Sequence, residues 1–253
     1  MTVIDRAHAK MDASEADRLQ FYERLADAEL FLLLDHAAEG EHITPKLFPV
    51  EGDTLVLAFD REERLAEFAG AAPYAALSGR RLAHMLSGAA LGLGLNLEVA
   101  PSAIILPSTA MAWLDETLGH TPGIVDATPQ ELHLPKGLPD ALLSGLDTKL
   151  AMAAGMARNA YLCGVAYEGG ARSHLLAFID PLPGAEDALA RAVNEALVFS
   201  GVEAGALDVA FFTASDPMAA RLAKTGLRFD LPEPAKPAPP DAPGMNPDKP
   251  PTL

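Results

Sequence analysis

Apolar positions in the first half of the chain recur in the spacings of both helices and strands. Phe21, Leu25 and Ala28 follow one another at intervals of four and three residues, which predicts a helix capped by Ser14. Residues 29–34 contain a short continuous apolar run, which is typical of a buried strand. The same reasoning predicts strands over 48–50, 54–59, 91–99 and 104–106, and helices that begin at Asp60, at Ser78 and near Met111. This half therefore predicts a mixed sheet with flanking helices.

The second half gives a clearer alternation of the two spacings. Two glycines, Gly169 and Gly170, separate apolar runs over 161–167 and 173–179, which predicts a hairpin. Strands are also predicted over 132–134, 207–212 and 227–229, with helices over 139–153, 185–197 and 216–225. The resulting order is that of a ferredoxin-like βαββαβ domain with an extra helix and strand. The predicted fold class is α+β with two domains.

Two changes in composition divide the chain. Helix-like sequence stops at the Pro and Gly of residues 120–123, and residues 233–253 are rich in proline with almost no large apolar side chain. We therefore expect a flexible N-terminus over 1–14, an N-terminal domain over 15–120, a C-terminal domain over 124–232 and a disordered Pro-rich tail over 233–253.

Composition limits the classes of protein, the partners and the cellular compartment that fit this chain. Hydrophobic residues make up 49% of the sequence, enough for burial to offset the entropy of ordering the chain. The net charge of -16 argues against nucleic-acid binding and favours either simple solubility or a basic partner. The lone Cys163 excludes an internal disulfide and Cys-rich zinc sites. Without an apolar signal-peptide core or a long apolar stretch, we expect a cytoplasmic protein that does not enter membranes.

Several stretches of the chain resemble the SseB family, whose name refers to enhanced serine sensitivity. They are residues 21–25, 28–30, 59–60, 65–68, 92–96, 104–107 and 113–114 in the first half, and 199–201 and 207–209 in the second. The resemblance covers roughly residues 17–232 and implies an SseB N-terminal domain followed by an SseB C-terminal domain. It implies a soluble bacterial protein, and it supplies no catalytic residue and no cofactor.

The residues that could carry chemistry each have a plainer explanation. The Gly-rich residues 92–96 could cradle a phosphate, but they lack the third glycine of a dinucleotide loop and fit a packed turn. His36 and His42 flank an acidic loop that could hold a metal weakly or could simply be solvated. Cys163 lies in a predicted strand and fits a core position better than a nucleophile. We therefore predict no catalytic, metal or cofactor-binding residue.

The sequence favours a non-catalytic interaction or regulatory protein with a protein partner. The candidate interaction surface consists of Leu91, Leu93, Leu95, Asn96 and Trp113, provided that the outer face of their strand is exposed. Trp113 could equally be an anchor that closes the domain. The alternatives are a sensor of a small ligand such as an amino acid, and an unrecognised enzyme. A groove between the domains would favour a ligand, whereas a flat apolar patch would favour a protein.

Overall fold

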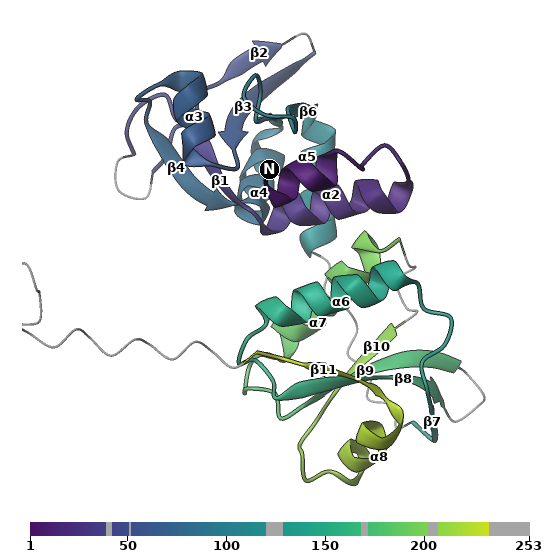
Figure 1. Cartoon of the computed structure of the whole chain (residues 1–253). Coiled ribbons are helices and arrows are strands. Elements are labelled where there is room, and N and C mark those ends of the chain that lie inside the picture. The colour runs from purple at the N-terminus through teal and green to yellow at the C-terminus, as the bar shows by residue number, and fades with distance from the viewer. Residues whose placement is uncertain (39–41, 51, 120–128, 168–171, 202–206, 233–253) are drawn as a thin grey trace, which may run out of the picture.

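Two lobes follow each other along the chain, each built on its own sheet (Figure 1). The computed structural model describes residues 1–38, 42–50, 52–119, 129–167, 172–201 and 207–232. We call residues 1–119 the N-terminal lobe and residues 129–232 the C-terminal lobe. Helices and mixed sheets occur in both, so the predicted α+β class with two domains is confirmed.

The N-terminal lobe is a six-stranded mixed sheet with helices on both faces. Its elements are α1 (Val3–His8), α2 (Glu15–Asp27), β1 (Glu29–Leu33), β2 (Phe48–Val50), β3 (Asp53–Phe59), α3 (Glu62–Ala69), β4 (Tyr74–Ser78), α4 (Gly79–Ala89), β5 (Gly92–Leu95), β6 (Ile104–Leu106) and α5 (Ser108–Gly119). The strand order is β4-β1-β3-β5-β6, with β2 paired to β3. Among the strand pairs described in this lobe, only β3–β5 is parallel.

Apolar side chains on both faces of this sheet bind it to its helices. On one face, Phe21 and Leu25 of α2, Leu82 of α4 and Leu114 of α5 pack in the main core cluster. A smaller cluster on the other face includes Leu65 of α3. Because β3 and β5 alternate between the two faces, nearly all of their side chains are buried.

The C-terminal lobe has the predicted element order but not the predicted pairing. Its elements are β7 (Glu131–His133), α6 (Asp140–Met152), β8 (Asn159–Ala166), β9 (Arg172–Ile179), α7 (Glu186–Phe199), β10 (Leu207–Phe212), α8 (Pro217–Thr225) and β11 (Leu227–Asp230). A ferredoxin-like sheet would place the first strand between the two parallel strands. Here β9 and β10 pair directly, and β7 lies beyond β8.

The ferredoxin-like arrangement is therefore wrong, and strand length explains why. β9 and β10 are in parallel register at six positions, from His174–Leu207 to Ile179–Phe212. β7 has only three residues and pairs with residues 164–166 of β8. β11 occupies the remainder of the same β8 edge, opposite residues 159–162. Two short strands thus share one edge, and neither could separate β9 from β10.

The start of the chain also differs from expectation. Residues 1–14 were expected to be flexible, yet α1 has a capping box between Thr2 and Asp5, and Ile4 and Ala7 are buried in the main core cluster. The expectation missed this because one helical turn carries too few apolar residues for a clear period. The predicted boundary at 120–124, the Gly169–Gly170 turn and the Pro-rich tail lie outside the described residues.

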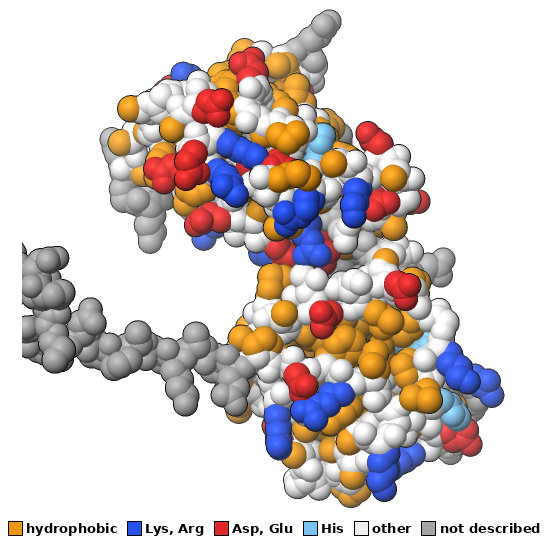
Figure 2. Space-filling model, viewed as in Figure 1, with side chains coloured by type: hydrophobic (Ala, Val, Ile, Leu, Met, Phe, Trp, Pro, Cys, Tyr) orange, Lys and Arg blue, Asp and Glu red, His pale blue; other side chains and the backbone are white. Residues whose placement is uncertain are grey.

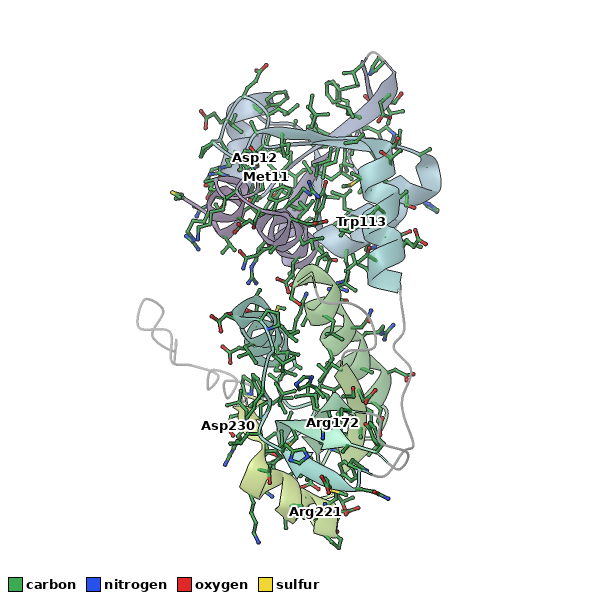
Figure 3. The ribbon with its side chains drawn as sticks, turned by 90° about the vertical axis from the view of Figure 1, so that its right-hand side faces the viewer. Met11, Asp12, Trp113, Arg172, Arg221 and Asp230 are labelled. Atoms are coloured by element: carbon green, nitrogen blue, oxygen red, sulfur yellow. The ribbon has the colours of Figure 1, made fainter. Side chains whose placement is uncertain are left out.

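The lobes meet over a narrow junction (Figure 2), where α2 and α5 of the N-terminal lobe contact α7 of the C-terminal lobe. Trp113 of α5 lies at this junction (Figure 3), with its ring 6.5 Å from that of Phe199 of α7. Phe199 belongs to the main core cluster of the N-terminal lobe, so an apolar contact ties the two bodies together. Within the described residues, no helix combines the length and the apolar character needed to cross a membrane.

Candidate functional site

An open groove of about 620 Å³ lies at the junction, with walls from both lobes. The N-terminal lobe supplies residues of α2, α4 and α5, and the C-terminal lobe supplies residues of α6 and α7. Charged side chains are prominent in its lining: Asp27, Arg80, Asp115, Lys149, Arg191 and Glu195. We call this feature the interlobe groove.

Lys149 of α6 is the centre of the charges at the base of the groove. Its side chain is only 3% exposed, and its Nζ lies 2.7 Å from Asp27 Oδ2 and 3.0 Å from Glu195 Oε2. Glu23 is a third carboxylate, at 3.8 Å. A buried ammonium is stable only when carboxylates compensate it, and these carboxylates come from both lobes. The cation of one lobe is therefore held by acids of both lobes.

Arg80 of α4 adds a second cation to the same carboxylates. It donates to both oxygens of Glu195, at 2.7 and 3.1 Å, and to Asp27 at 3.0 Å. Its position depends on Gly79, where a Cβ would lie 1.8 Å from the carbonyl oxygen of Leu25. Only glycine allows the start of α4 to approach the end of α2 so closely.

These five residues form an ionic set that we call the junction cluster: Glu23, Asp27, Arg80, Lys149 and Glu195. Burial opposes ionisation of Glu195, but its bonds to Arg80 and the nearby Lys149 outweigh that effect and lower its pKa. Glu23 differs, because burial raises its pKa more than Lys149 lowers it. Its Oε1 accepts no hydrogen bond from the described residues. The cluster is therefore compensated unevenly.

Two further charges line the groove outside the junction cluster. Arg191 of α7 is exposed, and no carboxylate pairs with it among the residues described. Across the groove, Asp115 of α5 is half-buried and lies 3.0 Å from His84 Nδ1. Met152 and Leu118 add apolar surface. This lining offers a guanidinium, a carboxylate and apolar contacts to a small molecule.

The predicted interaction surface is wrong for most of its residues. Leu93, Leu95 and Asn96 are at most 1% exposed, because β5 is an interior strand between β3 and β6 with helices over both faces. Leu91 is half-buried. Trp113, at 37% exposure, packs against Tyr22 and Phe199 and so joins the lobes. The prediction failed because it assumed that one face of the strand was exposed.

Asn96 belongs instead to a buried polar network, which we call the N-terminal clip: Asp5, Asp60, Arg64, Asn96 and Ser102. Arg64 donates to both oxygens of Asp5, at 3.0 and 2.6 Å, and to Asp60 at 2.7 Å. Ser102 donates to Asp5, and Asn96 donates to Ser102. These bonds fasten α1 to the turns after β3 and β5. The bond to Arg64 lowers the pKa of Asp5 despite its burial.

The remaining sequence candidates have structural roles. Cys163 is buried, and burial raises its pKa to about 11, so it is not a thiolate at neutral pH. At Gly92, a Cβ would lie 2.5 Å from Leu55 and 2.8 Å from the Leu106 carbonyl, which indicates close packing. His36 and His42 flank residues 39–41, which are outside the described part, and no group of metal-ligating side chains occurs in that part.

The junction cluster was missed, although one signal was present in the sequence. Lys149 follows Leu142 and Leu146 by seven and three residues, and Glu195 follows Ala188 and Ala192 in the same way. Both charges therefore lie on the apolar stripes of their helices, where an unpaired charge would be costly. Such positions indicate that a partner of opposite charge exists, but they do not identify it.

Residues 4–113 match the family model of the SseB protein N-terminal domain. The match extends from α1 to the middle of α5 and includes the whole N-terminal clip. No curated protein matches the chain, and no solved structure does.

Proposed function

We propose that this chain, whose residues 4–113 match the SseB N-terminal domain, is a non-catalytic regulatory protein that senses a small zwitterionic ligand. The ligand, an amino acid or a compound of similar charge, binds in the interlobe groove. The observation that carries this proposal is the groove itself, with charges of both signs in its lining.

The charges of Arg191 and Asp115 match the two ends of a zwitterion, although Asp115 also contacts His84 at 3.0 Å. Arg191 presents a planar guanidinium suited to a carboxylate, and Asp115 presents a carboxylate suited to an ammonium. The ligand's side chain would then contact the apolar surface around Met152. Because Asp115 and Arg191 belong to different lobes, such a ligand would favour one arrangement of the lobes over others.

The environment of the charged groups supports binding rather than catalysis. Asp27, Arg80, Lys149 and Glu195 bond to one another, so none is a free base or a free nucleophile facing the groove. A reactive thiol is unsupported as well, since Cys163 is buried in the sheet of the C-terminal lobe.

Thermal unfolding with each amino acid in turn tests this function. A ligand present at about a hundred times its Kd stabilises the folded state by about 2.7 kcal/mol and should raise Tm by several degrees. Arg191→Gln should remove the rise, whereas Arg172→Gln, which removes an exposed arginine outside the groove, should preserve it. A flat response to all amino acids at millimolar concentration would contradict the proposal.

A further inference from the structure

A basic face is present on the N-terminal lobe of this acidic protein. Arg6 and Lys10 lie on or just after α1, Arg24 lies on α2, and Arg61 precedes α3. Figure 2 shows Lys and Arg side chains gathered on this side of the lobe, around α1 and α2. The chain as a whole has a net charge of -16, so a local excess of cations requires a specific explanation.

The basic residues line two adjoining hollows beside α1. One has a volume of about 550 Å³ and includes Arg24 and Arg61, and the other has about 400 Å³ and includes Lys10. Both hollows share Met1, Val3, Arg6 and Arg24. We call the pair the α1 hollows. The same hollows also contain exposed apolar surface, since Met1 is 80% and Val3 52% exposed.

The acids in these hollows are largely engaged elsewhere. Asp60 pairs with Arg64 in the N-terminal clip, and Asp27 pairs with Lys149 and Arg80 in the junction cluster. Glu29 is exposed and remains as a countercharge.

The cations, in contrast, are largely uncompensated. Arg6 and Arg61 pair with no carboxylate in the described structure, and Arg24 has only Glu23 at 3.9 Å. The α1 hollows thus keep a net positive charge.

We propose that the α1 hollows bind an acidic peptide segment of a protein partner, with carboxylates on Arg6 and Arg61 and an apolar side chain between them. Guanidinium groups bind carboxylates through two parallel hydrogen bonds, and Met1 and Val3 supply the apolar contact. A protein segment of this kind is a known type of occupant for arginine-lined surfaces.

Charge elsewhere on the molecule favours a peptide over a nucleic acid. A duplex carries one negative charge per about 1.7 Å, so any part extending beyond the hollows would meet the acidic remainder of the surface. A short peptide can confine its carboxylates to the hollows. The exposed apolar surface in the hollows also matches a side chain better than a phosphate backbone.

Fluorescence anisotropy with a labelled, Glu-rich synthetic peptide that carries a central Leu tests the proposal on the full chain. The double variant Arg6→Gln/Arg61→Gln should bind the peptide about tenfold more weakly, or about 1.4 kcal/mol. The double variant Arg172→Gln/Arg221→Gln removes the same charge from the C-terminal lobe (Figure 3) and should bind like the wild type. Added salt should weaken wild-type binding.

Three outcomes would overturn the proposal. The first is equal weakening by both double variants, which would show a general charge effect. The second is equal affinity for a peptide with Gln in place of every Glu. The third is binding to a single-stranded oligonucleotide or to anionic phosphatidylglycerol vesicles, dependent on Arg6 and Arg61, without binding of the peptide. Arg191→Gln should leave peptide binding unchanged, so failure here is distinguishable from failure of the proposed sensor.

Discussion

The N-terminal clip and the junction cluster place similar charges in very different settings. In the clip, Arg64 holds Asp5 and Asp60 inside one lobe, and every member bonds to another member. In the junction cluster, Lys149 and Arg80 hold carboxylates across two lobes, and one oxygen of Glu23 accepts no hydrogen bond from the described part of the chain. The clip contributes only Asp60 to a surface hollow, whereas Asp27, Arg80, Lys149 and Glu195 of the junction cluster all line the interlobe groove.

This difference indicates where the molecule is built to be fixed and where it can respond. A buried network with all partners satisfied specifies one arrangement, because any rearrangement would leave a charge without a partner. A network that is incompletely satisfied and lies beside a groove can exchange partners with a ligand at lower cost. The clip should therefore govern folding of the N-terminal lobe, and the junction cluster should govern how the lobes are held together.

The largest effect is expected from Asp5→Asn in the clip. Asparagine removes the negative charge that Arg64 faces. If its NH2 group takes the place of Oδ2, it cannot accept the hydrogen bonds that Thr2 N and Arg64 donate to that oxygen. Breaking a buried ion pair on one side costs about 3–5 kcal/mol, and we expect about 3 because Arg64 keeps Asp60. Urea denaturation measures the loss. The matched control is Asp12→Asn, an exposed position for which we expect a change within about 0.5 kcal/mol.

A smaller effect is expected from Lys149→Met in the junction cluster. Methionine fills the space of the side chain but leaves three carboxylates with one cation fewer. Arg80 still neutralises Glu195 and Asp27, so we expect a loss of about 2 kcal/mol rather than the larger cost of a fully unpaired charge. Denaturation curves give this loss, and small-angle scattering should show a more extended molecule.

Lys224→Met is the control for that substitution, because Lys224 is exposed on α8 and lies outside the junction cluster. It should change neither stability nor shape. If Lys149→Met loses stability without any change in scattering, the junction cluster supports the C-terminal lobe alone and the comparison with the clip fails.

Lowering the pH should reduce the stability that both regions contribute, because folding stabilises the ionised form of a carboxyl group in each. The pKa of Asp5 and the pKa of Glu195 are lowered by folding, so their stabilisation is present above the unfolded pKa values, 3.8 and 4.5, and is lost as pH falls. Glu23 opposes this trend, because its pKa is raised and its contribution is lost as pH rises. Denaturation midpoints should fall below about pH 4.

Substitution separates the two contributions to this acid response. Asp5→Asn should flatten the part that comes from the N-terminal lobe, and Glu195→Gln should flatten the part that comes from the junction. An acid response that is unchanged in both variants would show that other carboxyl groups dominate.

The sequence predicted which segments form helices and which form strands, because this choice depends mainly on residues that are close together in the chain. Helix α7 and strands β8 and β9 were correct in kind, since their periods repeat over many residues. Strand pairing was predicted incorrectly. The place of β7 in the sheet depends on whether β7, β10 or β11 pairs with each free edge of β8 and β9, which are distant in the sequence. Local periodicity carries no information about that competition. The same holds for β5, whose burial on both faces depends on helices elsewhere in the chain.

The site was less predictable than the fold for a related reason. Lys149 and Glu195 are 46 residues apart in the sequence, and Asp27 is 122 residues from Lys149. Their positions on apolar stripes were visible, but the pairing depends on how two lobes dock. Residues 6, 24 and 61 likewise line one hollow only because α1 packs against α2 and is bonded to Asp60 and Arg64, on either side of residue 61.

The smallest effect is expected from Trp113→Phe, which tests whether apolar contact also holds the lobes. Trp113 contacts Tyr22 at 5.1 Å and Phe199 at 6.5 Å between ring centroids, and it is 37% exposed. An aromatic pair adds about 0.5–1.5 kcal/mol, and phenylalanine keeps part of the contact, so we expect a loss below about 1 kcal/mol. Tyr74→Leu is a matched control, because Tyr74 is 38% exposed and contacts Phe31 within one lobe. Each variant alone should lose a similar amount of stability in urea denaturation. When each is combined with Lys149→Met, only Trp113→Phe should increase the change in scattering that Lys149→Met causes. If the two variants behave alike in that background, the ionic contacts alone set the arrangement of the lobes.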